Sequence, residues 1–212
     1  MRLFAALFPP ARVLDGPGQL AEAVAALRSA DGAGELRWTD RAGWHITLAF
    51  YGEVPEERLP ELTVRLARAA RRGRPLRLRI AGSGRFGDRT LWAGIAPVPG
   101  EPDEGGAAEA LRRLAATTSA AGRRMGLGAQ EPGRFHAHLT VARVRPSAPP
   151  AAGLRPCAEA LEPFRGEPWT ADEIALVRSE PPRSGRPGEQ PRYEQVAAWP
   201  LGRSDVRLRW MA

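Results

Sequence analysis

Trp44-His-Ile-Thr-Leu-Ala-Phe-Tyr51 and Phe135-His-Ala-His-Leu-Thr-Val-Ala142 are the two stretches of the sequence that decide the fold. Each alternates with a period of two, which is the pattern of a strand that has one face in the core. The residues expected on the buried faces are Trp44, Ile46, Leu48 and Phe50 in the first stretch and Phe135, Ala137, Leu139 and Val141 in the second. Each opposite face carries a histidine followed two residues later by a threonine, namely His45 and Thr47, and His138 and Thr140.

The remainder of the chain predicts a mixture of strands and helices around these two strands. Apolar runs and alternation predict further strands near residues 2–8, 76–80, 90–96, 173–179, 192–198 and 206–210. Apolar residues at helical spacing predict helices near residues 20–27, 59–66, 107–124 and 157–161. Segments rich in proline or glycine at 97–106, 146–156 and 181–191 are expected to be loops. This irregular order is typical of an α+β fold with antiparallel sheets, not of a doubly wound parallel sheet.

The composition is that of a soluble globular protein with an excess of positive charge. The 212 residues include 31 Lys+Arg, all of them arginine, against 24 Asp+Glu, which gives a formal net charge of +7. That excess gives mild support to an anionic partner such as a nucleic acid or a phosphate ester. Cys157 is the only cysteine, so neither an internal disulfide nor a cysteine-based zinc site is expected. No apolar run approaches the roughly 18 residues of a membrane helix, and we expect a cytoplasmic monomer that does not bind membranes.

The pattern His-x-Thr-apolar-Ala occurs twice, beginning at His45 and at His138. The repetition indicates an internal duplication, with residues 1–212 forming a single domain of two interleaved lobes that each contribute one motif. Residues i and i+2 of a strand stand about 6.5–7 Å apart on one face, so a threonine hydroxyl and an imidazole can hold one phosphate group. Two such pairs facing each other would bracket a phosphorus atom. One histidine could then take a proton from an attacking water while the other gives one to the leaving oxygen, with no metal ion required.

At these motifs the sequence resembles the 2H phosphoesterase superfamily, in particular the RNA 2′,3′-cyclic phosphodiesterases once called 2′-5′ RNA ligases. The resemblance extends over Met1-Arg-Leu-Phe-Ala-Ala-Leu7, Leu91-Trp92, Leu176-Val-Arg-Ser179, Arg192-Tyr-Glu194 and Trp199-Pro-Leu201, and thus over nearly the whole chain. It implies a bilobal α+β fold in which two antiparallel sheets, related by a pseudo-twofold duplication, flank a central groove with helices outside. Ala137 departs from the family, which usually has proline before the second motif.

The resemblance also implies a reaction and a role for each motif residue. The reaction is metal-independent opening of the 2′,3′-cyclic phosphate at an RNA or oligonucleotide end to a 2′-phosphomonoester, with 2′-5′ ligation as its reverse. His45 would be the proton donor to the 3′ leaving oxygen and His138 the proton acceptor from water. Thr47 and Thr140 would bind the phosphate, and neither a metal nor a cofactor is implied.

Other residues near the motifs have more than one interpretation. Tyr51 shares the expected histidine face and could stack on a base in the groove, or be a rim aromatic. His136 is expected to form part of the groove wall, although His-x-His on a strand can also bind a metal. Arg143 could reach the phosphate if the strand end is bulged, or it could serve packing or a salt bridge. The aromatic residues expected in the core are Phe8, Trp92 and Trp199.

Three other functions remain open from the sequence alone. A related phosphodiesterase could act on a small cyclic phosphate, such as a cyclic nucleotide or an ADP-ribose cyclic phosphate. A non-catalytic RNA-binding module would bind RNA in a salt-dependent way and form no product. A metalloprotein centred on His136 and His138 would contain zinc.

Overall fold

Two antiparallel β-sheets form the centre of the molecule in the computed structural model, which describes residues 1–31, 34–100, 104–128, 135–146, 148–149, 153–182 and 189–202. The first sheet, in strand order, consists of β3 (Ile46–Glu53), β1 (Arg2–Leu7), β8 (Glu173–Glu180) and β9 (Arg192–Pro200). The second consists of β2 (Leu36–Trp38), β6 (His138–Val144), β5 (Thr90–Pro97), β4 (Leu76–Phe86) and β7 (Trp169–Ala171). The chain passes back and forth between the sheets, and one His-x-Thr motif lies in each.

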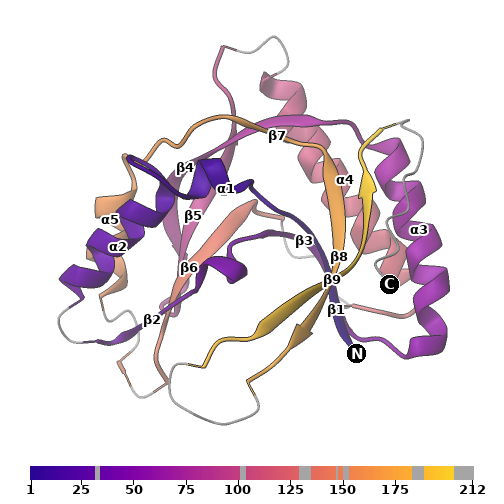
Figure 1. Cartoon of the computed structure of the whole chain (residues 1–212), viewed down its shortest axis with the longest axis horizontal. Helices are drawn as coiled ribbons and strands as arrows, with labels where there is room; N and C mark the ends of the chain where they lie inside the picture. Colours follow the sequence, from indigo (N-terminus) through magenta and orange to yellow (C-terminus); the bar gives the residue numbers. More distant parts are fainter. Residues whose placement is uncertain are drawn as a thin grey trace.

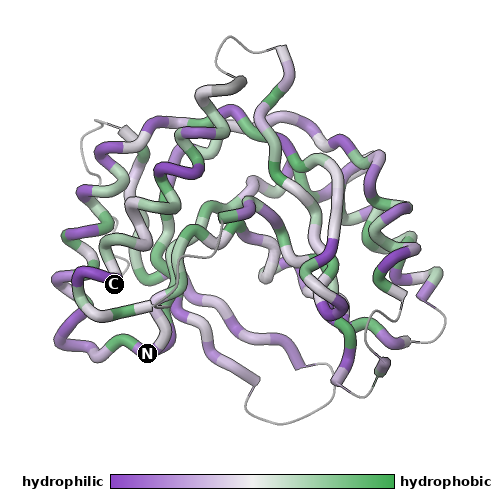
Figure 2. Tube along the Cα trace, turned by 180° about the vertical axis from the view of Figure 1, so that it is seen from behind, coloured by the Kyte–Doolittle hydropathy of each residue, from purple (hydrophilic) through white to green (hydrophobic). Residues whose placement is uncertain are grey.

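Helices cover the outer side of each sheet (Figure 1). The first sheet is covered by α3 (Leu59–Arg72), which packs on β9, and by α4 (Glu104–Arg123), which packs on β3. The second sheet is covered by α5 (Leu154–Leu161), which packs on β4 and β5 and also contacts α2 (Leu20–Ala30). Short helical turns are α1 (Ala11–Leu14), η1 (Arg41–Gly43) and η2 (Glu56–Arg58). Hydrophobic residues recur along the helices between hydrophilic ones, as expected when one face lies on a sheet (Figure 2).

The expected fold class is confirmed: an α+β architecture with two antiparallel sheets. The helix expected near 107–124 corresponds to α4, and the strand expected near 173–179 corresponds to β8. The strand expected at 206–210 lies outside the described residues, as do residues 183–188 of the loop expected at 181–191. Among the described helices, none is long and apolar enough to cross a membrane.

The two middle strands of the first sheet, β1 and β8, are buried on both of their faces along most of their length. Leu3, Ala5 and Leu7 of β1 belong to the main core, which extends through both sheets and their helices. Phe4 and Ala6 alternate with them and form a second, smaller cluster with residues of β8, against which Tyr193 of β9 packs. The small cluster lies on the sheet face that also carries His45, because the ring of Phe4 stacks on that imidazole.

Two irregularities in the pairing of β3 with β1 change which side chains of β3 face the core. The pairing skips Leu48 and Tyr51, so each is an extra residue on β3, and the alternation restarts after it. Tyr51 is consequently buried (2% exposed), whereas Phe50 is 41% exposed. The expectation that Phe50 lies in the core and Tyr51 lines a groove is therefore wrong. The Tyr51 hydroxyl instead donates to the backbone carbonyl of Thr118 in α4.

Candidate active site

His45 lies between η1 and β3, in a setting formed by three aromatic side chains. Phe4 stacks on the imidazole with ring centroids 4.6 Å apart. Phe8 lies at 5.6 Å in a tilted orientation, and Tyr193 of β9 meets the imidazole edge-on at 5.2 Å. Phe8 is 41% exposed, so the expectation that it belongs to the core is wrong, since it forms the outer side of this aromatic setting. These three rings fix the orientation of His45.

His138 is the first residue of β6, and it too is bordered by aromatic rings. Phe86 of β4 meets it edge-on at 4.7 Å, and Trp92 of β5 lies at 6.4 Å. Trp92 is half-buried and lines this side of the site, in contrast to Trp199, which is buried as expected. His136 is exposed, packs 4.4 Å from the Trp92 ring and stacks beside His138 at 6.3 Å.

The backbone selects the tautomer of His138. Its Nδ1 lies 2.7 Å from the carbonyl oxygen of His136. A carbonyl oxygen only accepts, so Nδ1 carries the hydrogen and the neutral ring has its lone pair on Nε2. That nitrogen is the one able to accept a proton from a ligand or a water.

The two imidazoles influence each other electrostatically, although 93 residues separate them in the sequence. The pKa of His45 is lowered to about 4, mainly by burial and in part by the charge of His138, while the backbone of Ala42 offsets some of this lowering. Within the described residues, Nδ1 of His45 has no hydrogen-bond partner of ordinary geometry. Burial is also the main cause of the lowered pKa of His138. The hydrogen bond to the His136 backbone raises this pKa, whereas the charges of His136 and Arg143 lower it. Both rings are therefore neutral at pH 7 when nothing is bound.

Thr47 and Thr140 follow the two histidines along their strands and are half-buried. As far as the described residues show, neither hydroxyl makes a hydrogen bond within the protein. Each is therefore available to a ligand. The structure thus provides one histidine and one free hydroxyl donor at the beginning of β3 and another such pair at the beginning of β6, and these strands belong to two different sheets.

Arg143 lies on the same face of β6 as His138 and Thr140. The pairing of β6 with β5 skips Val141, and this irregularity reverses the alternation that would have directed Arg143 away. Its guanidinium donates to the Thr90 hydroxyl at 3.1 Å.

Further arginines gather near the same site. Burial raises the pKa of the Tyr193 phenol and is the largest effect on it. This pKa is lowered by three arginines, Arg143, Arg2 of β1 and Arg37 of β2. Arg37 also lowers the pKa of Arg143, in addition to burial. Positive charges from both sheets thus converge beside the histidines, which favours an anionic ligand.

Several residues of this site were not predicted from the sequence. They are Phe4, Phe86, Tyr193, Arg2 and Arg37. All come from strands other than those bearing the motifs, so only the sheet pairing brings them to the histidines. The metal interpretation of His136 and His138 finds no third ligand, because the described part of the chain contains no group of three or more His, Cys, Asp or Glu side chains that could hold a metal ion.

Comparison with known proteins gives consistent results. A family model described as the 2′-5′ RNA ligase superfamily matches residues 16–183. The RNA 2′,3′-cyclic phosphodiesterase of Thermus thermophilus is 34% identical over 188 residues, which are 85% of this chain and 82% of that protein. The RNA 2′,3′-cyclic phosphodiesterase of Geobacillus stearothermophilus is 31% identical over 169 residues, or 77% of this chain, and the match spans only about half (47%) of that longer protein.

Solved structures show the same fold. The crystal structure of the Thermus thermophilus protein TT0787 superposes with a TM-score of 0.68 at 28% identity and covers 96% of this chain and 100% of its own. That of E. coli LigT complexed with 3′-AMP has a TM-score of 0.64 at 23% identity and covers 94% and 97%. The second similarity concerns the fold alone.

Proposed function

Because the chain belongs to the 2′-5′ RNA ligase superfamily, we propose that it hydrolyses the 2′,3′-cyclic phosphate at the end of an RNA or oligonucleotide to a 2′-phosphomonoester. The observation that carries the proposal is the pair of His-x-Thr motifs, on different sheets, whose imidazoles act on each other electrostatically. Relatives named RNA 2′,3′-cyclic phosphodiesterase support the same reaction.

In the proposed reaction His138 is the general base and His45 the general acid. Nε2 of His138 removes a proton from a water, whose oxygen attacks the phosphorus as the bond from phosphorus to the 3′ oxygen breaks. His45 gives its proton to that leaving oxygen, so the product carries a 3′ hydroxyl and a 2′-phosphomonoester. The tautomer set by the His136 carbonyl supports the basic role of His138, because it leaves Nε2 unprotonated.

The hydroxyl and guanidinium groups of the site stabilise the phosphoryl oxygens. Thr47 and Thr140 donate to the two non-bridging oxygens, and Arg143 offsets the charge that builds up on them. Since these groups and the two imidazoles supply all proton transfers and charge compensation, the proposed reaction needs no metal ion or cofactor.

The protonation state required for catalysis comes from the substrate. His45, with its pKa lowered to about 4, is neutral in the empty site at pH 7. A bound phosphate anion favours the imidazolium and raises that pKa. His45 therefore becomes a proton donor when the phosphodiester is in place.

Product analysis of an RNA that ends in a 2′,3′-cyclic phosphate tests the proposal. The wild type should yield the 2′-phosphate, distinguished from the 3′-phosphate by ³¹P NMR, with no effect of EDTA. His45→Ala or His138→Ala should lower the rate by at least about a hundredfold, while circular dichroism shows an unchanged fold. Full activity in either variant refutes the acid and base roles of the two histidines. Salt-dependent RNA binding without product formation supports the binding module instead.

The proposal also covers 2′-5′ ligation and the location and oligomeric state of the protein. When a 5′ hydroxyl group takes the place of water, His138 removes its proton, its oxygen bonds to the phosphorus, and the bond to the 3′ oxygen breaks as His45 protonates that oxygen, which leaves a 2′-5′ linkage. The two histidines exchange roles when this linkage is cleaved back to the cyclic phosphate. We further propose a cytoplasmic monomer in which residues 1–212 form one domain of two interleaved lobes, because a single chain supplies both motifs and the surrounding arginines.

A further inference from the structure

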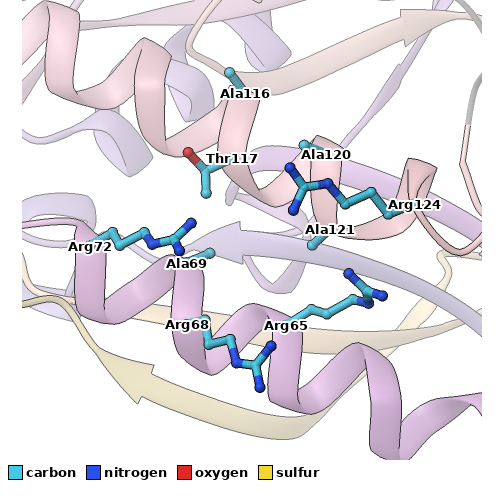
Figure 3. Close-up of a pocket in the computed structure, with 9 residues that line it drawn as sticks. All are labelled: Arg65, Arg68, Ala69, Arg72, Ala116, Thr117, Ala120, Ala121 and Arg124. Atoms are coloured by element: carbon cyan, nitrogen blue, oxygen red, sulfur yellow. The ribbon is translucent and has the colours of Figure 1, made fainter.

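A groove lined by arginines lies between α3 and α4, on the outer surface of the molecule (Figure 3). We refer to it as the α3–α4 groove. Its volume is about 320 Å³. Its lining residues are Arg65, Arg68, Ala69 and Arg72 on α3, Ala116, Thr117, Ala120 and Ala121 on α4, and Arg124 directly after α4.

The positive charge of the α3–α4 groove is largely uncompensated. Arg65 pairs with Glu61 at 2.8 Å. Over the residues that the structure describes, Arg68, Arg72 and Arg124 have no acidic partner, and all three are exposed. No acidic side chain is among the lining residues. Like charges three or four residues apart destabilise a helix, so Arg68 and Arg72 gain from an anion between them.

The shape of the groove suits a chain of phosphates. The small side chains of Ala69 and Ala121 are nearly fully buried and form its floor, so the arginine side chains stand above it on both sides. Arginines 65, 68 and 72 recur along one face of α3, and Arg124 reaches back from the other side (Figure 3). Guanidinium groups bind phosphate through paired hydrogen bonds, and a row of them favours a polyanion over one isolated ion.

The groove is separated from the histidines by the first sheet and the helices on it. Tyr51, on the face of β3 opposite to Thr47, packs against α4 through its hydrogen bond to Thr118. The route between the two regions passes the edge strand β9. Tyr193 of β9 touches His45, and α3 packs on β9.

We propose that the α3–α4 groove is a second binding surface for the RNA substrate, where arginines hold backbone phosphates upstream of the cyclic end. The strand would leave the histidines past β9 and continue over α3. This inference rests on the proposed function for the nature of the ligand. It adds that the protein binds its RNA at two places, the cyclic end at the histidines and the backbone phosphates at the α3–α4 groove.

The test compares a long single-stranded RNA with a dinucleotide, both ending in a 2′,3′-cyclic phosphate. In the variant Arg68→Gln/Arg72→Gln/Arg124→Gln we expect KM for the long RNA to rise by about tenfold or more, with kcat and all parameters for the dinucleotide unchanged. The slope of log affinity against log salt should also become less steep by about 2, at about 0.7 for each lost phosphate contact.

A matched control removes the same number of charges from arginines that do not line the groove. Arg112, Arg113 and Arg155 are exposed and pair with Glu109 or Glu159, so Arg112→Gln/Arg113→Gln/Arg155→Gln should leave KM for the long RNA near the wild-type value. An equal rise of KM in the control overturns the inference, because net charge alone would then explain it. An unchanged KM in the groove variant, or an equal effect on the dinucleotide, also overturns it.

Binding measurements separate this inference from the proposed function. Fluorescence anisotropy with a long RNA that already ends in a 2′-phosphate reports affinity without turnover. If the wild type hydrolyses no cyclic phosphate but the groove variant binds this RNA about tenfold more weakly than the wild type, the proposed reaction is refuted and the α3–α4 groove is supported as an RNA-binding surface. If turnover is as proposed but both proteins bind the RNA equally, the groove inference fails.

Discussion

The burial of His45 makes the stability of the fold depend on pH in a way that one substitution should remove. The ring titrates near 6.5 in an unfolded chain but has a pKa of about 4 in the folded protein, mainly because it is buried among Phe4, Phe8 and Tyr193. Protons therefore bind the unfolded state more readily between these two values, and stability falls as the pH drops below 6.5. Above 6.5 the ring is neutral in both states and contributes no pH dependence.

The size of the effect follows from the two pKa values. Each pH unit between them is worth about 1.4 kcal/mol, so the full penalty below pH 4 is about 3 kcal/mol. Because carboxylates also titrate in strong acid, the measurement is best made at pH 5. There the free energy of unfolding should already be about 2 kcal/mol lower than at pH 8. Loss of this size is a considerable fraction of the stability of an ordinary domain.

Urea unfolding at pH 8 and pH 5 measures the effect. The free energy of unfolding of the wild type should fall by about 2 kcal/mol more than that of His45→Gln, in which the titration is absent. Groups that do not interact with His45 titrate alike in both proteins and cancel from the comparison. A direct check is the NMR titration of the His45 ring, whose midpoint should lie near pH 4 and rise when inorganic phosphate is added. A midpoint near 6.5, or equal pH dependence of stability in both proteins, refutes the argument that burial lowers the pKa of His45. It also refutes the proposal that the bound substrate is what protonates this ring.

Two further substitutions test the packing that positions the site. Gly84 on β4 lies beneath Trp92, and a Cβ atom there would come within 2.3 Å of the indole, so Gly84→Ala should cost about 1–3 kcal/mol by thermal unfolding and lower kcat/KM. An unchanged melting temperature would show that the indole moves freely. Tyr51→Phe removes the buried hydrogen bond to Thr118 and should cost about 1 kcal/mol in urea unfolding, with KM and kcat unchanged for a dinucleotide substrate. A raised KM in that variant would return Tyr51 to the substrate site.

The two His-x-Thr pairs were predictable because each is encoded within three consecutive residues. Alternation along a strand is a local property, and it places His45 with Thr47 and His138 with Thr140 on one face whatever the rest of the chain does. The α+β class was predictable for the same reason, since the strands and helices show their periods within short windows.

The residues that the sequence misassigned depend on pairing between strands. Phe50 is exposed and Tyr51 is buried, the reverse of the prediction, because β3 has extra residues relative to β1. Arg143 lies on the same face as His138 because β6 has one extra residue relative to β5. Such a bulge is defined by two strands together, so the pattern of one strand alone does not reveal it. The rings around His45 come from β1 and β9, at opposite ends of the sequence, and could be assigned to the site only once the sheet order was known.

The same desolvation that keeps both imidazoles neutral in the empty site also accounts for how the proposed cycle resets. After one turnover His138 holds the proton taken from water and His45 has lost its own. While the phosphomonoester remains bound, its negative charge stabilises the protonated His138. Once the product leaves, burial and the charges of His136 and Arg143 lower the pKa of His138 again, so its proton passes to solvent. The next phosphodiester then raises the pKa of His45 and restores the donor, and the arginines keep the empty site attractive to anions throughout because their charge does not depend on the cycle.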